Sequence, residues 1–230
     1  VLMVTFGMND SGYYEYNGDN AKEFGEQKYQ ESIKNFQQME KRFKELPHTR
    51  IVMTGTSPYD ETAQIKDNTV FKKKNETIKR IIEYQRESAA RNGWEFTDWN
   101  APMVAINQEL QQKDPSFTLC GNDRIHPDND GHMVMAYLFL KAQGFAGKDV
   151  ANMEINANKK QAVKAEGCTI SNIKKIGKDI SFDYLAEALP YPLDTIARGW
   201  GSKKSQAEVI KEVPFMEEMN RETLKVTGLK

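Results

Sequence analysis

Two polar segments of the sequence carry residue types that can move protons or stabilise a developing charge. In one of them, Asp123 stands three positions before His126, in a loop that ends at Pro127. A carboxylate at that spacing can accept a hydrogen bond from Nδ1 of the imidazole, fix its tautomer and stabilise the imidazolium form. The spacing therefore predicts a general base, His126, that is oriented by Asp123. A hydrogen bond that only shapes the loop is the alternative from these residues alone.

The other polar segment, Gly7 to Asp10, follows an apolar stretch at the start of the chain. Gly7 allows the backbone to turn tightly, and the side-chain amide of Asn9 is a suitable hydrogen-bond donor for an oxyanion. The segment therefore predicts an oxyanion donor at Asn9. An Asx-turn, in which the Asn9 side chain only holds its own loop, is the alternative.

The remaining histidines, His48 and His132, offer weaker candidates for chemistry. His48 follows a proline in a turn between elements, and we expect it to be solvated. His132 falls in the first turn of an expected helix, where the helix dipole disfavours an imidazolium ion, so a packing role is expected. Asp123, His126, Asp128 and His132 could together form a metal site, but no His-x-x-x-His pairing supports one. We therefore expect neither a metal nor another cofactor.

The elements that must position these groups alternate between strand and helix. Apolar or alternating segments predict strands at 1–6, 50–54 and 94–99, and helical periodicity predicts helices at 20–46, 69–91, 102–113 and 130–141. Such alternation is typical of crossover units that build a parallel sheet. Because ligands bind outside the carboxyl ends of parallel strands, we expect the functional loops to start at Gly7, Ser57 and Thr118.

The composition excludes several classes of protein. The 32 basic and 33 acidic side chains give a formal net charge of -1, and no long run of one sign occurs, which argues against a nucleic-acid partner. The longest apolar run, at 133–140, is far shorter than the roughly 20 residues that span a bilayer, so no membrane span is expected. Cys120 and Cys168 are too few for a disulfide framework. Whether these two cysteines pair stays open.

The character of the sequence changes after Gly147. We expect one domain over 1–147 and an appended region of mixed α and β structure over 148–230, which is rich in lysine. A helical stretch is expected at 204–220, and 223–229 is expected to approach another strand. An early stop of the chain within this region is therefore one expectation.

The segments around Asn9 and His126 resemble two conserved blocks of the SGNH or GDSL hydrolase superfamily. The segment 4–10 looks like the family's third block, Gly-x-Asn-Asp after a strand, and 123–127 looks like its fifth block, Asp-x-x-His-Pro before the final helix. The resemblance covers about 1–147. It implies a three-layer α/β/α fold with a flavodoxin-like parallel sheet, of which this chain lacks the first strands.

The resemblance also implies an activity, that of a serine esterase or acylhydrolase working through an acyl-enzyme. By motif, His126 would be the general base, Asp123 its orienting acid and Asn9 an oxyanion-hole donor, while Gly7 and Asp10 would shape the cleft. The family's nucleophilic serine belongs to a first block, Gly-Asp-Ser, which lies upstream of the third.

The first block and the second-block glycine are not found in this sequence, because Val1 already belongs to the strand of the third block. Ser57 lacks a Gly-x-Ser-x-Gly elbow and Ser11 lies in the wrong loop. We therefore expect the nucleophile on an amino-terminal segment that is missing from this chain and that would be its partner. Without the nucleophile, this fragment is expected to be inactive.

The expected substrate is an ester of a small acyl group, carried by a carbohydrate. Tyr13, Tyr14 and Tyr16 follow the third block closely and could stack on a sugar or line an acyl pocket. A glycan-binding protein that keeps the fold without catalysis is the alternative function. A secreted or periplasmic location in a bacterium is implied by the resemblance alone.

Overall fold

A computed structural model describes residues 1–66, 69–188 and 191–229 of the chain. The chain divides into two compact units. The first unit comprises Val1–Ala142 and Asp194–Glu212, and the second comprises Gln143–Leu193 and Val213–Lys230. The segment 194–212 therefore belongs with the first unit, although it follows most of the second unit in sequence, and the sequence patterns do not predict this return.

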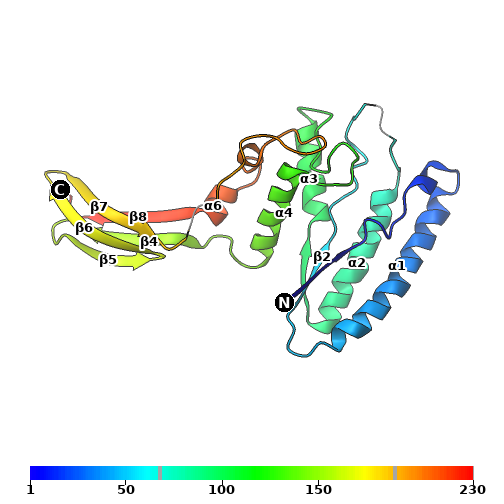
Figure 1. Ribbon diagram of the computed structural model, residues 1–230, viewed down its shortest axis with the longest axis horizontal. Helices are drawn as coiled ribbons and strands as arrows, with labels where there is room; N and C mark the ends of the chain where they lie inside the picture. Colours follow the sequence, from blue (N-terminus) through cyan, green and yellow to red (C-terminus); the bar gives the residue numbers. More distant parts are fainter. Residues whose placement is uncertain (67–68, 189–190, 230) are drawn as a thin grey trace. The chain divides into compact units, whose positions relative to one another are not determined.

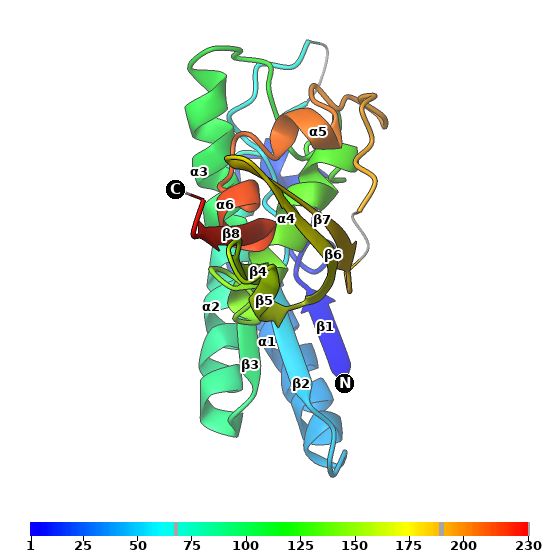
Figure 2. The same ribbon diagram turned by 90° about the vertical axis from the view of Figure 1, so that its left-hand side faces the viewer.

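A parallel sheet of three strands forms the centre of the first unit (Figure 2). The strands are β1 (Leu2–Phe6), β2 (Ile51–Gly55) and β3 (Glu95–Asp98), with β2 in the middle. In the register of the sheet, Val4 lies opposite Met53, and Met53 lies opposite Phe96. The predicted parallel sheet is confirmed, and the carboxyl ends of its strands meet at one edge.

Helices cover both faces of this sheet (Figure 1). Helices α1 (Ala21–Lys44) and α2 (Lys74–Asn92) pack together on one side, and α4 (Asn129–Ala142) contacts β3 on the other. The helical elements of this unit are η1 (Tyr14–Asn17), α1 (Ala21–Lys44), α2 (Lys74–Asn92), α3 (Asn100–Gln111), α4 (Asn129–Ala142) and α5 (Gln206–Val209). The arrangement confirms the predicted α/β/α layers.

The core of the first unit follows from the helical and strand periodicities. All five residues of β2 are buried, as expected for a central strand covered on both faces. Ile78 and Ile82 of α2 pack into one buried cluster, whereas Phe36 of α1 packs with Met53 in another. Burying each large apolar side chain stabilises the fold by about 1.5–3 kcal/mol. These two clusters hold α1 and α2 to the sheet and so fix the loops at its edge.

The predicted start of α2 at residue 69 is wrong, because the helix begins at Lys74. Tertiary contacts override the local pattern: Phe71 packs in the core, and its backbone N–H donates to the hydroxyl of Tyr59 at 2.9 Å. Lys73 then takes a left-handed conformation with φ of 70°. Glu61, from another loop, accepts the N–H groups at the helix start, including that of Lys73 at 2.8 Å.

The second unit is built mainly from strands. They are β4 (Asp149–Asn156), β5 (Gln161–Glu166), β6 (Cys168–Ile176), β7 (Asp179–Ala186) and β8 (Arg221–Thr227), with the short helix α6 (Phe215–Met219). One sheet has the order β5-β4-β8, and β6 pairs with β7 in an antiparallel hairpin. The segment 223–229, expected to approach another strand, mostly belongs to strand β8 itself. The single helix expected at 204–220 is wrong, because only the short helices α5 and α6 form there.

Two further observations concern the two cysteines and the helices of the structure. Cys120 and Cys168 are both buried free thiols. Within the described ranges, no helix combines the length and the apolar character that crossing a bilayer demands.

Candidate active site

Asp123 and His126 form a hydrogen-bonded pair in the loop that precedes α4. The distance between Oδ2 of Asp123 and Nδ1 of His126 is 2.6 Å. The other carboxylate oxygen accepts the backbone N–H groups of Ile125, at 2.9 Å, and of His126, at 3.0 Å. The His126 side chain is 69% exposed, and its Nε2 atom has no hydrogen-bond partner among the described residues. The ring is thus held through one nitrogen and open to a substrate or nucleophile through the other.

Electrostatics keep the Asp123 carboxylate charged. Partial burial acts to raise its pKa, but the hydrogen bonds from the His126 ring and from the backbone N–H groups of His126 and Ile125 outweigh burial, and the pKa is lowered. The carboxylate is therefore ionised at neutral pH and can stabilise a positive charge on the imidazole.

A buried arginine within the Asp123–His126 loop holds the loop to residues 60–63. Arg124 is 1% exposed and has a left-handed φ of 68°. Its Nη1 donates to the carbonyl oxygens of Asp60, at 3.0 Å, and Ala63, at 2.8 Å. In return, the backbone N–H of Asp60 donates to the Arg124 carbonyl at 3.0 Å. A left-handed non-glycine residue costs free energy, and these contacts hold the loop in that conformation.

Asn9 lies in a tight turn directly after β1. The turn is closed by backbone hydrogen bonds from Ser11 to Gly7 and from Gly12 to Asn9, each at 3.1 Å. Gly7 has φ of +135°, and a Cβ there would meet the Thr56 side chain at 3.2 Å, so the turn favours glycine at this position. An open hollow of about 120 Å³ is lined by the turn and by Thr56. The turn therefore exposes Asn9 at the carboxyl end of β1.

The orientation of the Asn9 amide is set by a neighbouring tyrosine. The Tyr13 hydroxyl donates to Oδ1 of Asn9. This contact turns the amide so that its NH₂ group faces away from Tyr13, and that group has no hydrogen-bond partner among the described residues. The amide is therefore presented as a donor, which suits an oxyanion.

The Asn9 turn and the Asp123–His126 loop meet at the same place in the unit. Met8, Tyr13 and Ile125 pack against one buried cluster. Burial raises the pKa of Tyr13, and the negative charges of Asp123 and Asp10 raise it further. The structure thus brings together the two segments that the sequence singled out, although about half of the chain lies between them.

Lys74 is a buried residue of this site that the sequence reasoning missed. Its ammonium group reaches from the start of α2 under the Asn9 turn and donates to the carbonyl oxygens of Met8, at 2.8 Å, and Gly12, at 2.5 Å, and to Oγ of Ser11 at 2.6 Å. It also lies 3.9 Å from the centre of the Tyr13 ring. Three acceptors and an aromatic face match the three donors and the charge of an ammonium ion. Lys74 therefore holds the turn that carries Asn9.

The burial that gives Lys74 this position also weakens its charge. Burial lowers its pKa to about 7, against the opposing influence of the negative charges on Asp10 and Glu61. Asp10, expected to shape the cleft, thus acts electrostatically on both Lys74 and Tyr13. No signal in the sequence marks Lys74, because it ends a run of three lysines, which is typical of a solvated surface.

The tyrosines near Asn9 have different environments. Tyr16 is buried in the core, and its hydroxyl donates to the Ser11 carbonyl at 2.8 Å. Tyr14 is exposed and meets Phe71 edge to face. Tyr16 therefore cannot stack on a substrate, whereas Tyr14 presents an open face.

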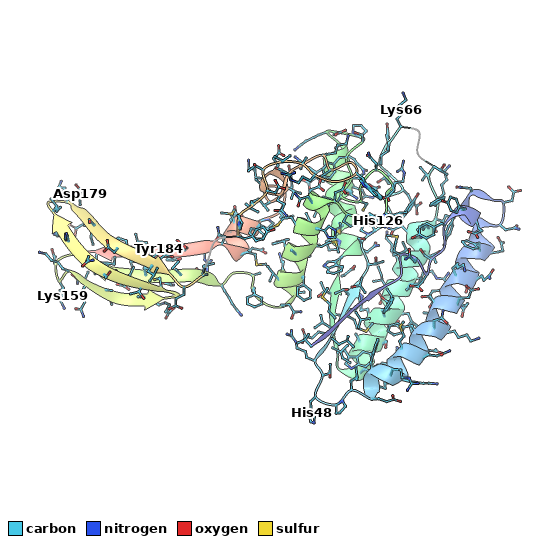
Figure 3. All side chains as sticks on the ribbon, in the orientation of Figure 1. His48, Lys66, His126, Lys159, Asp179 and Tyr184 are labelled. Carbon is cyan, nitrogen blue, oxygen red and sulfur yellow. The ribbon has the colours of Figure 1, made fainter. Side chains whose placement is uncertain are left out.

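The two other histidines, His48 and His132, are not part of the hydrogen-bonded pair of Asp123 and His126. Figure 3 shows His48 at the lower end of the first unit, far from His126. His132 is exposed, so the packing role expected for it is wrong. Across the described ranges, the structure has no group of three or more His, Cys, Asp or Glu side chains that could hold a metal ion.

The serines considered as nucleophiles are both buried. Oγ of Ser11 donates to the Met8 carbonyl at 2.8 Å and accepts from Lys74. Ser57 lies in the loop after β2 and is also buried. Neither hydroxyl is presented to solvent beside the exposed ring of His126.

Comparison with known proteins places the chain in a family. The profile of the family described as GDSL-like Lipase/Acylhydrolase matches residues 1–139. A solved structure of a gut microbial diltiazem-metabolizing enzyme is 97% identical over 98% of this chain, with a TM-score of 0.88. This chain spans 51% of that protein.

A second solved structure, that of an acetyl xylan esterase, is 19% identical. The match covers 61% of this chain and 66% of that one, with a TM-score of 0.37. No curated protein matches the chain. Because the family profile matches more than half of the sequence, the chain belongs to the GDSL-like lipase/acylhydrolase family.

Proposed function

We propose that the protein containing this chain is a serine ester hydrolase that works through an acyl-enzyme. His126 is its general base, Asp123 orients the base, and Asn9 donates a hydrogen bond to the oxyanion. One observation carries this assignment: the 2.6 Å contact between Asp123 and Nδ1 of His126, which leaves Nε2 of an exposed ring unpaired. Membership of an acylhydrolase family supports the same reaction.

The reaction proceeds in two transfers of the acyl group. Nε2 of His126 takes the proton of a serine hydroxyl while the serine oxygen attacks the ester carbonyl. The negative oxygen of the tetrahedral intermediate accepts a hydrogen bond from the Asn9 amide, and the Asp123 carboxylate stabilises the imidazolium. His126 then protonates the leaving alcohol. Water, deprotonated by His126, attacks the acyl-enzyme and releases the acid and the serine.

We place the nucleophilic serine on a segment outside this chain. Ser11 and Ser57 are buried, which argues against either as the nucleophile. Strand β1 ends the sheet, and its apolar residues Met3 and Phe6 are 46% and 44% exposed. A strand that lies beside β1 would pair its open edge and cover these side chains. The chain's coverage of half of the diltiazem-metabolizing enzyme leaves room for such a segment.

The proposed substrate is an ester with a small acyl group. The hollow beside Asn9, of about 120 Å³, supports a short acyl group. The exposed face of Tyr14 supports a carbohydrate as the acylated alcohol. The 97% identity with the diltiazem-metabolizing enzyme makes diltiazem a second compound to test.

Steady-state kinetics of the full-length protein on 4-nitrophenyl acetate test the function. His126→Ala should lower kcat by at least about 1,000-fold, because the variant has no general base. His132→Ala is the matched control: that histidine is exposed and lies close in sequence, and its loss should change kcat less than twofold. A fall of less than tenfold for His126→Ala, or equal falls for both variants, would remove His126 as the base.

A further inference from the structure

An exposed aromatic ring lies beside His126 and has no part in the proposed acyl transfer. Trp200 is 71% exposed. Its ring centre lies 6.1 Å from that of His126, with the two planes 77° apart. Within the described ranges, its indole N–H also has no hydrogen-bond partner. Trp200 therefore offers an apolar face and one donor next to the exposed imidazole labelled in Figure 3.

The backbone around Trp200 is tied to the loop that carries His126. The Trp200 N–H donates to Oδ1 of Asp128 at 2.9 Å, and the Trp200 carbonyl accepts from the Asn122 N–H at 3.3 Å. Further along, the Asn129 N–H donates to the Arg198 carbonyl at 3.4 Å. These contacts come from both sides of His126 in the sequence. The position of Trp200 relative to the imidazole is thus fixed by hydrogen bonds and not by packing of the indole itself.

Two glycines allow this close approach. Gly199 and Gly201 have φ of +124° and +149°, a region that other residues rarely adopt. A Cβ on Gly199 would lie 2.1 Å from Oδ1 of Asp128, and one on Gly201 would lie 2.2 Å from Oδ1 of Asn122. The segment 199–201, which we name the tryptophan clip, therefore presents the indole as its one side chain. A tryptophan that served the core would instead be buried.

The proposed roles of Asn9 and His126 determine which half of the ester lies near the tryptophan clip. In the proposed reaction the carbonyl oxygen faces Asn9, and the oxygen that leaves is protonated by Nε2 of His126. The group beyond the leaving oxygen lies next to the imidazole, and Trp200 lies beside that imidazole. The alcohol half of the ester is thus the part within reach of the indole, whereas the acyl half belongs to the hollow at Asn9.

We propose that Trp200 is a binding subsite for the alcohol half of the ester and that it selects alcohols containing a ring. An aromatic ring and the C–H face of a sugar ring share the required chemistry, a flat apolar surface that stacks on an indole. The subsite rests on the proposed function, because it takes its place from the role of His126. It goes beyond that function by making ring structure in the leaving alcohol the basis of selection.

Three acetates of primary alcohols test the subsite in the full-length protein: ethyl acetate, benzyl acetate and methyl 6-O-acetylglucoside. Their acyl groups are identical, so differences in kcat/KM report the alcohol. Trp200→Ala should lower kcat/KM roughly tenfold for one or both ring esters and less than twofold for ethyl acetate. Trp200→Phe, which keeps a ring, should retain most of the activity. The benzyl and glucoside arms distinguish an aromatic from a sugar ligand.

Ile196→Ala is the matched control, since Ile196 is also exposed and lies in the same segment 194–212 as Trp200. This variant should leave kcat/KM unchanged for all three esters. If Trp200→Ala lowers all three equally, the clip only supports the His126 loop, and the subsite is overturned. No effect on either ring ester overturns it as well. His126→Ala is measured in parallel: retained hydrolysis there removes the proposed function and the subsite together, whereas lost hydrolysis with a uniform Trp200→Ala effect removes the subsite alone.

Discussion

Asp123 and Lys74 both hold a loop of the site through hydrogen bonds, but only Asp123 could be found from the sequence. Its partner stands three positions away, so spacing alone predicts their contact, and the structure has it at 2.6 Å. The acceptors of Lys74 lie in a turn more than sixty positions away in sequence. Lys74 is buried because it makes these contacts with residues distant in sequence, and the residues next to it in the sequence do not predict them.

Asp123→Asn should lower kcat of the full-length protein by about 10,000-fold, because an amide neither holds the required tautomer nor stabilises the imidazolium. The asparagine can still accept the backbone N–H groups of Ile125 and His126, so the melting temperature should change little. Asp114→Asn, which alters another turn-capping carboxylate, serves as the control. A loss within tenfold would mean that Asp123 only shapes its loop.

Lys74 should make the stability of the first unit depend on pH. Its pKa is lowered from 10.5 to about 7 in the folded protein, so between these values the unfolded chain binds the proton and the folded chain does not. The free energy of unfolding should therefore rise with pH from 7 to 10, by about 1.4 kcal/mol per pH unit relative to Lys74→Met.

Urea unfolding followed by tryptophan fluorescence measures this difference. Trp94, Trp99 and Trp200 all lie in the first unit, so the signal reports that unit. Lys74→Met lacks the titrating group and is the reference at each pH. Parallel stability curves for the two proteins would show that the Lys74 proton is not coupled to folding.

At the scale of elements, periodicity predicts most helices and strands because their apolar faces pack on the sheet. The helix α1 begins and ends close to its predicted bounds. The start of α2 is displaced because Phe71 and Glu61 make tertiary contacts that no local pattern contains. The residue type of Asn9 predicts a site in the turn after β1. The hydrogen bond from Tyr13 to Asn9 is not predicted, because it depends on how the turn folds back on itself.

The variant Tyr13→Phe tests whether the Tyr13 hydroxyl orients the side-chain amide of Asn9 for catalysis. Removing the hydroxyl frees the Asn9 amide to rotate, so kcat should fall about tenfold while KM stays nearly constant. Asn9→Ala should lower kcat about 100–1,000-fold. In the Asn9→Ala background, Tyr13→Phe should have no further effect, because the amide that it orients is gone.

Tyr14→Phe provides the control for this cycle, since Tyr14 is exposed next to Tyr13. Its kcat should equal that of the parent protein. Additive losses from Tyr13→Phe and Asn9→Ala would contradict the coupling and assign Tyr13 a separate role.

At the scale of the whole molecule, the sequence predicts a first domain over 1–147 followed by one appended region over 148–230, whereas the two compact units of the structure have other bounds. The segment 194–212 belongs to the first unit and brings Trp200 to the His126 loop. Its attachment depends on glycine conformations and on acceptors that lie far away in sequence, such as Asp128. Long-range contacts of this kind have no periodic signature, so the subsite beside His126 could not be predicted.

Under the proposed function, the nucleophilic serine lies on a segment of the full-length protein outside this chain. A fluorophosphonate, which reacts with an activated serine, tests this most directly when applied to the full-length protein and followed by mass mapping of the labelled peptide. We predict one label on a serine outside residues 1–230, lost in His126→Ala and kept in His132→Ala. A label on a serine within 1–230, or labelling that persists in His126→Ala, would contradict the account.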